Sequence, residues 1–222
     1  MFIKNHNPLG ARQQKGYSLV ELSVALAIVA VILVGALLGT RQIMLTNSVN
    51  NQVRETATVI TKIQRQYAKQ SNTAGANTQM LVPLGIWPGE RTSQANGTWT
   101  VRGVINSMTE SVFANEAAIG TLPANGGFIY TLRGVPVEAC ADMVTALDSV
   151  AFAIYAGPQA SSAPTTGATP TSTAVKTADS GSVNLTELAR GCASSATTTP
   201  AAGGTPTTTA VTAVDIALVF RQ

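Results

Sequence analysis

The chain has 222 residues, of which only 11% are charged, and its formal net charge is +3. This length accommodates one globular domain and a membrane segment. The charged fraction is low for a cytosolic protein, in which about a quarter of the residues are usually charged. Lys4, Arg12 and Lys15 account for the positive balance, because 14 − 3 = 11 basic residues then face 11 acidic ones. With no basic patch left downstream, we expect no nucleic-acid binding.

Residues 1–16 are polar and basic, and an apolar run follows from Leu19 to Leu38. About twenty residues of helix, at roughly 1.5 Å each, are enough to cross a bilayer. Because positive residues precede the run, the N-terminus is expected in the cytoplasm and the remainder outside. No small-residue cleavage site follows the run, unlike a secretory signal peptide. Glu21 lies inside the run, where a carboxylate is costly enough to indicate a function.

Hydrophobic residues continue at three- and four-residue steps as far as Tyr67. This spacing predicts one helix of about fifty residues from Ser18 to near Gln70. Its first half needs lipid or sister helices, and its amphipathic second half is expected to pack on its own domain.

Turn-forming residues from Ser71 to Gln79 end the helix. Residues 80–119 are expected to be irregular apart from one strand, and Trp87 to pack into the domain from a turn. The pattern predicts strands at Gly97–Ile105, Gly126–Gly134, Ala151–Gly157 and Asp215–Gln222, and helices at Pro136–Val150 and Asn184–Cys192. Together these elements predict an α+β fold, with an antiparallel sheet packed on the long helix.

Two tracts rich in Ser, Thr and Ala, at about residues 159–182 and 193–209, are predicted to be low-complexity loops. Two interpretations of these tracts are left as alternatives: an exposed, O-glycosylated surface, and ordinary flexible loops.

Both cysteines, Cys140 and Cys192, follow the apolar run, so they are expected outside the cytosol. One disulfide is then the favoured interpretation, and a pair of unrelated buried thiols is the alternative. His6 is the only histidine, and neither cysteine belongs to a CxxC motif. No nucleophile–histidine pair or phosphate-binding loop is evident. We therefore expect no enzyme, no catalytic residues, no cofactor and no metal site.

The junction KG|YSLVEL resembles the cleavage motif of type IV prepilins, in which a basic leader ends in Gly and a Glu follows at the head of an apolar helix. The resemblance implies a leader at residues 1–16, cut by prepilin peptidase between Gly16 and Tyr17, with N-methylation of Tyr17. It also implies a helical spine at residues 17–70, of which about 19–38 crosses the membrane before assembly, and a head at residues 71–222.

The new amine of Tyr17 would give Glu21 a partner, either in a neighbouring subunit or in its own. Glu21 is then interpreted as a docking residue that sets the axial register, and a partly hydrated Glu at the membrane surface is the alternative. Gly35 and Gly39 either allow close helix packing or mark a stretch that loosens in a filament.

The segments FIYTLRGVPVEACADMVTALDSV and LARGC are similar to type IVb pilins, such as those of toxin-coregulated, bundle-forming and thin conjugative pili. The resemblance implies a homo-oligomeric filament for adhesion, aggregation or conjugative contact. It would be built from the bacterial inner membrane by an assembly platform and an assembly ATPase, and would end as an extracellular pilus. The alternatives are a minor pilin or adhesin, a pseudopilin of a type II secretion system, and a static single-span membrane protein with an external binding head.

Overall fold

The computed structural model describes residues 18–105, 108–162, 164, 166–178, 180–193, 195–198 and 207–222. The chain divides into two units, Met1–Met44 and Leu45–Gln222. The leader at residues 1–16, the cleavage residues Gly16 and Tyr17 and most of the second low-complexity loop lie outside the described residues.

A single helix, α1, runs from Leu19 to Tyr67, close to the predicted bounds. Within the second unit its buried stripe consists of Val49, Gln52, Thr56, Val59, Ile60, Ile63 and Tyr67. The spacing of three and four residues places these side chains on one side of the helix. The Gln222 side-chain amide donates to the carbonyl of Tyr67 at 2.8 Å and also to that of Gln70. The Tyr67 carbonyl also accepts from the backbone N–H of Gln70 at 2.8 Å, so the amide of Gln222 adds a second donor at the end of the helix.

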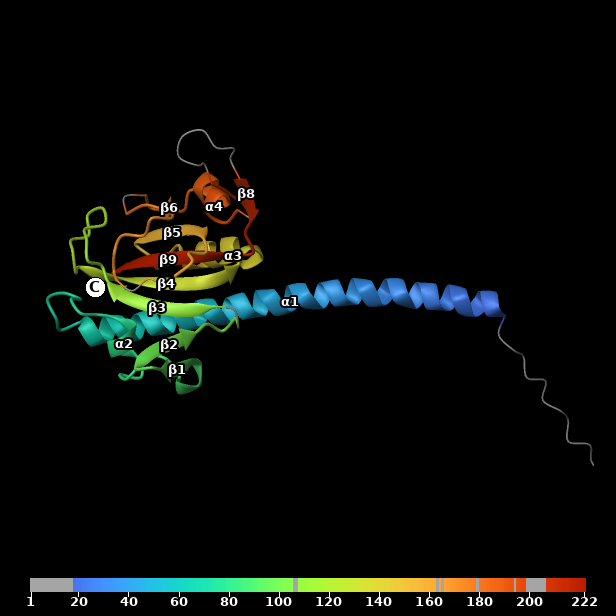
Figure 1. Ribbon diagram of the computed structural model, residues 1–222, viewed down its shortest axis with the longest axis horizontal. Coiled ribbons are helices and arrows are strands. Elements are labelled where there is room, and N and C mark those ends of the chain that lie inside the picture. Colours follow the sequence, from blue (N-terminus) through green and yellow to red (C-terminus); the bar gives the residue numbers. More distant parts are fainter. Residues whose placement is uncertain are drawn as a thin grey trace, which may run out of the picture. The chain divides into compact units, whose positions relative to one another are not determined.

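A seven-stranded antiparallel sheet forms the body of the second unit, in the order β1-β2-β3-β4-β9-β5-β6 (Figure 1). Its strands are β1 Thr92–Ala95, β2 Thr98–Arg102, β3 Thr109–Ala114, β4 Gly127–Pro136, β5 Ala153–Pro158, β6 Thr173–Lys176 and β9 Ala213–Arg221. A separate pair consists of β7 Ser195–Thr198 and β8 Thr207–Ala210. Strand β9 lies between β4 and β5, although both precede it by many residues.

The short helices of this unit are α2 Thr78–Leu81, η1 Gly89–Arg91, α3 Val137–Leu147 and α4 Leu185–Gly191. Helix α3 packs on β4 and β9, and α4 packs on β5 and β6. The predicted α+β fold, a long helix with an antiparallel sheet, is confirmed. The prediction that Trp87 packs into the domain is also confirmed, because only 3% of its surface is exposed.

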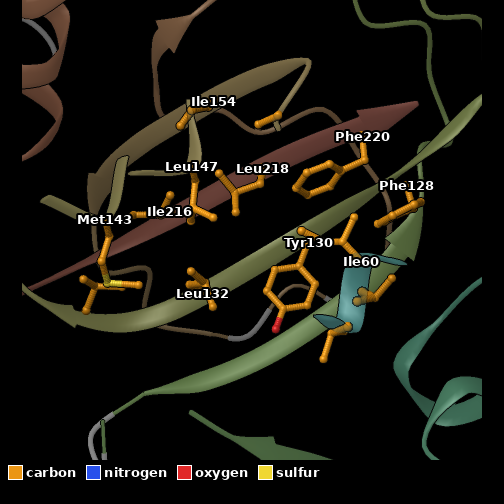
Figure 2. Close-up of a cluster of buried hydrophobic side chains, with 14 of the residues drawn as sticks. Ile60, Phe128, Tyr130, Leu132, Met143, Leu147, Ile154, Ile216, Leu218 and Phe220 are labelled. Atoms are coloured by element: carbon orange, nitrogen blue, oxygen red, sulfur yellow. The ribbon is translucent and has the colours of Figure 1, made fainter. Parts of the chain in front are cut away.

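The main core fills one face of the sheet, which α1 and α3 cover. Figure 2 shows Ile60 of α1 and Met143 of α3 directed at one group of inward side chains from β4, β5 and β9. The rings of Phe128 and Phe220 stack at 5.3 Å between centroids. A smaller cluster, which includes Ile129 and Val219, fills part of the opposite face.

The prediction that residues 80–119 are irregular apart from one strand is wrong, because α2, β1 and β3 also form there. Strands β1 and β3 are rich in Ser, Thr, Gln and Glu, so they lack the apolar alternation of a half-buried strand. Strand β2 ends at Arg102 rather than Ile105. Asn96 and Gly97 join β1 to β2, and both have the positive φ of a tight hairpin turn. The two predicted low-complexity loops are not wholly irregular, because β6 lies inside the first, and β7 and most of β8 lie inside the second.

Candidate assembly site

The part of α1 in the first unit presents apolar side chains on every side. All its described side chains are exposed, including Leu19 at 85% and Val31 at 75%. By length and composition the helix could cross a membrane. An apolar helix whose described side chains are all exposed is not stable in water, so this part of the helix requires lipid or other copies.

The polar side chains of this segment suit an apolar environment. The Ser23 hydroxyl donates to the carbonyl of Val20 and the Thr40 hydroxyl to that of Ala36, both at 2.8 Å. Because these hydroxyls are satisfied within the helix, lipid leaves them no unmet hydrogen bond. Glu21 lies in the first turn of α1, where the helix dipole favours a negative charge. Its proposed partner, the amine of Tyr17, lies outside the described residues.

A disulfide joins Cys140, in the first turn of α3, to Cys192, which follows the last residue of α4. The sulfur atoms are 1.94 Å apart and the Cα atoms 5.7 Å apart. Asn184 caps the other end of α4 by accepting from the backbone N–H groups of Thr186 and Glu187. The bridge therefore holds α4, and with it the edge of the sheet, to the core helix α3.

We expect the paired substitutions Cys140→Ser and Cys192→Ser to lower the stability of the head by about 4 kcal/mol, since the bridge closes a loop of roughly fifty residues. Thermal unfolding of the full chain in detergent measures this loss. Reductant should lower the transition of the wild-type chain by a similar amount and leave that of the double variant unchanged. Alkylation of both cysteines in the native, unreduced protein would contradict the pairing.

A buried carboxylate, Glu110, is surrounded by four donors, and we name the five residues together the Glu110 cluster. Trp87 Nε1 donates to Glu110 Oε2 and Gln52 Nε2 to Oε1, both at 2.7 Å. The guanidinium of Arg91 forms an ion pair with the same carboxylate, and the Tyr130 hydroxyl donates to it. The Glu110 side chain is fully buried. Its charge is thus compensated by one cation and three neutral donors, as a buried carboxylate requires.

The Glu110 cluster joins α1 to the sheet. Gln52 belongs to α1, and its Oε1 accepts from the backbone N–H of Val104 at 2.6 Å. Arg91 also pairs with Glu55 of α1, and its Nε donates to the carbonyl of Arg102 at 2.7 Å. Burial alone would lower the pKa of Arg91, but Glu110 and Glu55 raise it above its usual value, so the guanidinium stays charged.

Burial, with the nearby Glu110 carboxylate, raises the pKa of Tyr130 well above 10.0. A raised pKa in the folded state means that the stability linked to Tyr130 is complete below pH ~10 and is lost as the pH rises further. We expect the wild-type head to unfold in this alkaline range. The Tyr130→Phe variant, though less stable at neutral pH, should lose less stability over the same range. Circular dichroism beside tyrosinate absorbance measures both, and equal alkaline losses in the two proteins would contradict this role.

The residues predicted for the site lie in separate parts of the chain. Glu21 is in the first unit, the cysteine pair is in the second, and Gly16 and Tyr17 are outside the described residues. Sequence reasoning missed the Glu110 cluster. One available signal was Gln52, a polar residue at a buried position of the apolar stripe.

Comparison with known proteins finds a family model for the N-terminal motif and solved structures with a similar fold. Residues 11–37 match the model of the prokaryotic N-terminal methylation motif. The type IVb pilin from Salmonella typhi is 16% identical over 78% of this chain and 99% of its own, with a TM-score of 0.50. For TcpA, a type IV pilin from the Vibrio cholerae El Tor biotype, identity is 16%, coverage is 78% and 98%, and the TM-score is 0.42. No curated protein matched the chain.

The chain carries the methylation motif at residues 11–37, and its long helix with an antiparallel sheet is the type IV pilin fold. This likeness in fold is to the type IVb pilin from Salmonella typhi.

Proposed function

We propose that the chain is a subunit of a type IVb pilus, an extracellular filament for adhesion, aggregation or conjugative contact. The observation that carries the proposal is the exposed apolar part of α1, with Glu21 in its first turn and a methylation motif across its start. Such a segment suits a precursor anchored in the inner membrane that later packs against sister helices. An assembly platform and an ATPase in that membrane would drive the transfer.

In this proposal prepilin peptidase removes residues 1–16 and Tyr17 becomes the N-methylated first residue of the subunit. The new amine then lies four residues before Glu21. A register in which the amine of one subunit meets Glu21 of a neighbour leaves neither charge unpaired, whereas any axial slip separates them. The disulfide-bonded head stays outside the filament core and provides its surface.

Replacement of Gly16 by Leu tests the proposal, because a bulky side chain at the cleavage position should block the peptidase. Only full-length precursor should then accumulate in the membrane, and sheared filaments should disappear. The matched control is Gly10→Leu, the same change inside the leader, which should be processed normally. Mass spectrometry of the sheared wild-type protein should show an N-methylated Tyr17 at its start. A filament protein that retains residues before Tyr17 would overturn the proposal.

A further inference from the structure

The solvent side of α1 in the second unit carries charges of one sign. Arg54, Thr58, Lys62 and Arg65 recur at steps of three and four residues, all are exposed, and we name them the basic face. Their spacing places them on one side of the helix, away from the buried stripe. The one acidic residue of α1 in this unit, Glu55, pairs with Arg91 instead. The basic face therefore presents a charge of about +3 to solvent.

The basic face lacks compensation within the described part of its own chain. Lys62 Nζ donates to the carbonyl of Ile86 at 3.0 Å, a neutral group. Among the described residues, no acidic side chain forms an ion pair with Arg54 or Arg65. Two such faces would repel each other in a filament, whereas an acidic surface would fit against one.

Helix α3 carries the opposite charge on its solvent side. Glu138 and Asp142 are four residues apart, and Thr145 follows three residues later; all three are exposed, and we name them the acidic face. The other side of α3 is buried and includes Cys140, Met143 and Leu147. Helix α3 contains no Lys or Arg. The disulfide at Cys140 fixes the helix, so the acidic face is presented rigidly.

Both helices cover the same side of the sheet but at different strands. Gln52 of α1 reaches Glu110 on β3, whereas α3 packs on β4 and β9. In Figure 2, Ile60 of α1 lies beside Tyr130, whereas Met143 and Leu147 of α3 lie toward Ile216. The two charged faces thus belong to different places on one head. A contact between unlike patches on identical subunits builds an open filament when its rotation does not close into a ring.

We propose that the basic face of α1 in one copy receives the acidic face of α3 in the next copy of the filament. This inference rests on the proposed pilin function and names the residues through which neighbouring heads meet. A single exposed ion pair stabilises a contact only slightly, and salt screens it. The same contact is repeated at every subunit, and arrangements that bring two basic faces or two acidic faces together are disfavoured by repulsion. The charges therefore favour one arrangement of neighbouring subunits over others.

Charge reversal with rescue tests the contact. We expect Arg54→Glu with Arg65→Glu, or Glu138→Lys with Asp142→Lys, to lower the yield of sheared filaments at least about tenfold, because attraction becomes repulsion. All four substitutions together should restore the yield to within about threefold of wild type, since the charges are again complementary. The control is Arg102→Glu, the same change at an exposed position on β2, which should assemble normally.

The outcomes separate this inference from the proposed function. If the wild-type chain forms no filaments, the pilin function itself fails. If filaments form but either double reversal leaves the yield unchanged, or the fourfold variant is not rescued, the contact is overturned. Equal amounts of processed protein in the membrane show that each variant folds and is exported.

A crosslinking experiment tests the contact directly. Thr58 lies on the basic face and Thr145 on the acidic face. Within the described part of the chain, their hydroxyls donate only to carbonyls of their own helices, one for Thr58 and two for Thr145. Copies that carry Thr58→Cys and copies that carry Thr145→Cys are expressed together and treated with a short thiol crosslinker. Covalent dimers should form from the mixture and not from either variant alone. Absence of dimers from the mixture, or equal dimers from one variant alone, would overturn the contact.

Discussion

The Glu21→Gln variant is expected to be made, processed and held in the membrane in normal amount, while filaments are largely lost. Gln keeps the shape of the side chain and removes its charge. For a simple membrane anchor this change is neutral or favourable, because a buried carboxylate is costly. In a filament it leaves the proposed Tyr17 amine without a counter-ion. Opposite charges about 4 Å apart attract by roughly 4 kcal/mol at an effective dielectric constant near 20.

The measurement for Glu21 is the yield of sheared filaments beside the total membrane content of the protein. The matched control is Ser23→Ala, two residues further along the helix, because the Ser23 hydroxyl donates to the carbonyl of Val20 in its own helix. Mixed with wild-type chains, the Gln variant should enter filaments at low frequency, where one unpaired site among many is tolerated. A normal yield from cells that make only the Gln variant would rule out the docking role of Glu21.

The Glu110→Gln variant is expected to destabilise the head by about 3–5 kcal/mol, because it removes one partner of a buried ion pair. The Arg91 guanidinium would keep only Glu55 as its counter-ion, and the amide of the new Gln would compete with Gln52, Trp87 and Tyr130 as a donor. For a domain of this size the transition temperature should fall by on the order of 10 °C.

Thermal unfolding of the full chain in detergent, with the disulfide intact, measures this effect. The matched control is Glu187→Gln, which breaks the exposed pair with Arg190 and should cost less than about 1 kcal/mol. Trp87→Phe, which removes one donor to the carboxylate, should fall between the two. A Glu110→Gln head that melts within a degree or two of wild type would contradict the joining role of the Glu110 cluster.

The periodic elements of this fold could be predicted from the sequence. Helix α1 and helix α3 have apolar residues at helical spacing, and β4 and β9 are apolar runs between turn residues. Such elements bury a continuous apolar surface, so their local pattern already indicates their structure. The cleavage at Gly16 and the docking role of Glu21 stay predictions.

The polar part of the fold could not be predicted in the same way. The Glu110 cluster gathers side chains from α1, β3, β4 and the segment around η1, and no local spacing relates them. Strand β3 places Glu110 toward the core and Phe113 toward the opposite face, which reverses the usual expectation for such residues. The dipeptide Asn96–Gly97 was a signal for the β1–β2 hairpin, because these residues favour a two-residue turn.

The central position of β9 has a consequence for the timing of folding. Its neighbours β4 and β5 begin at Gly127 and Ala153, whereas β9 begins only at Ala213. In the proposed export, β4 and β5 have no strand between them until residues 213–221 have crossed the membrane, and the edges that later pair with β9 stay open. Pairing across such long stretches of chain is slow, and open strand edges favour aggregation. We therefore expect the head to complete its sheet only late in export, a stage at which a periplasmic chaperone would have most effect.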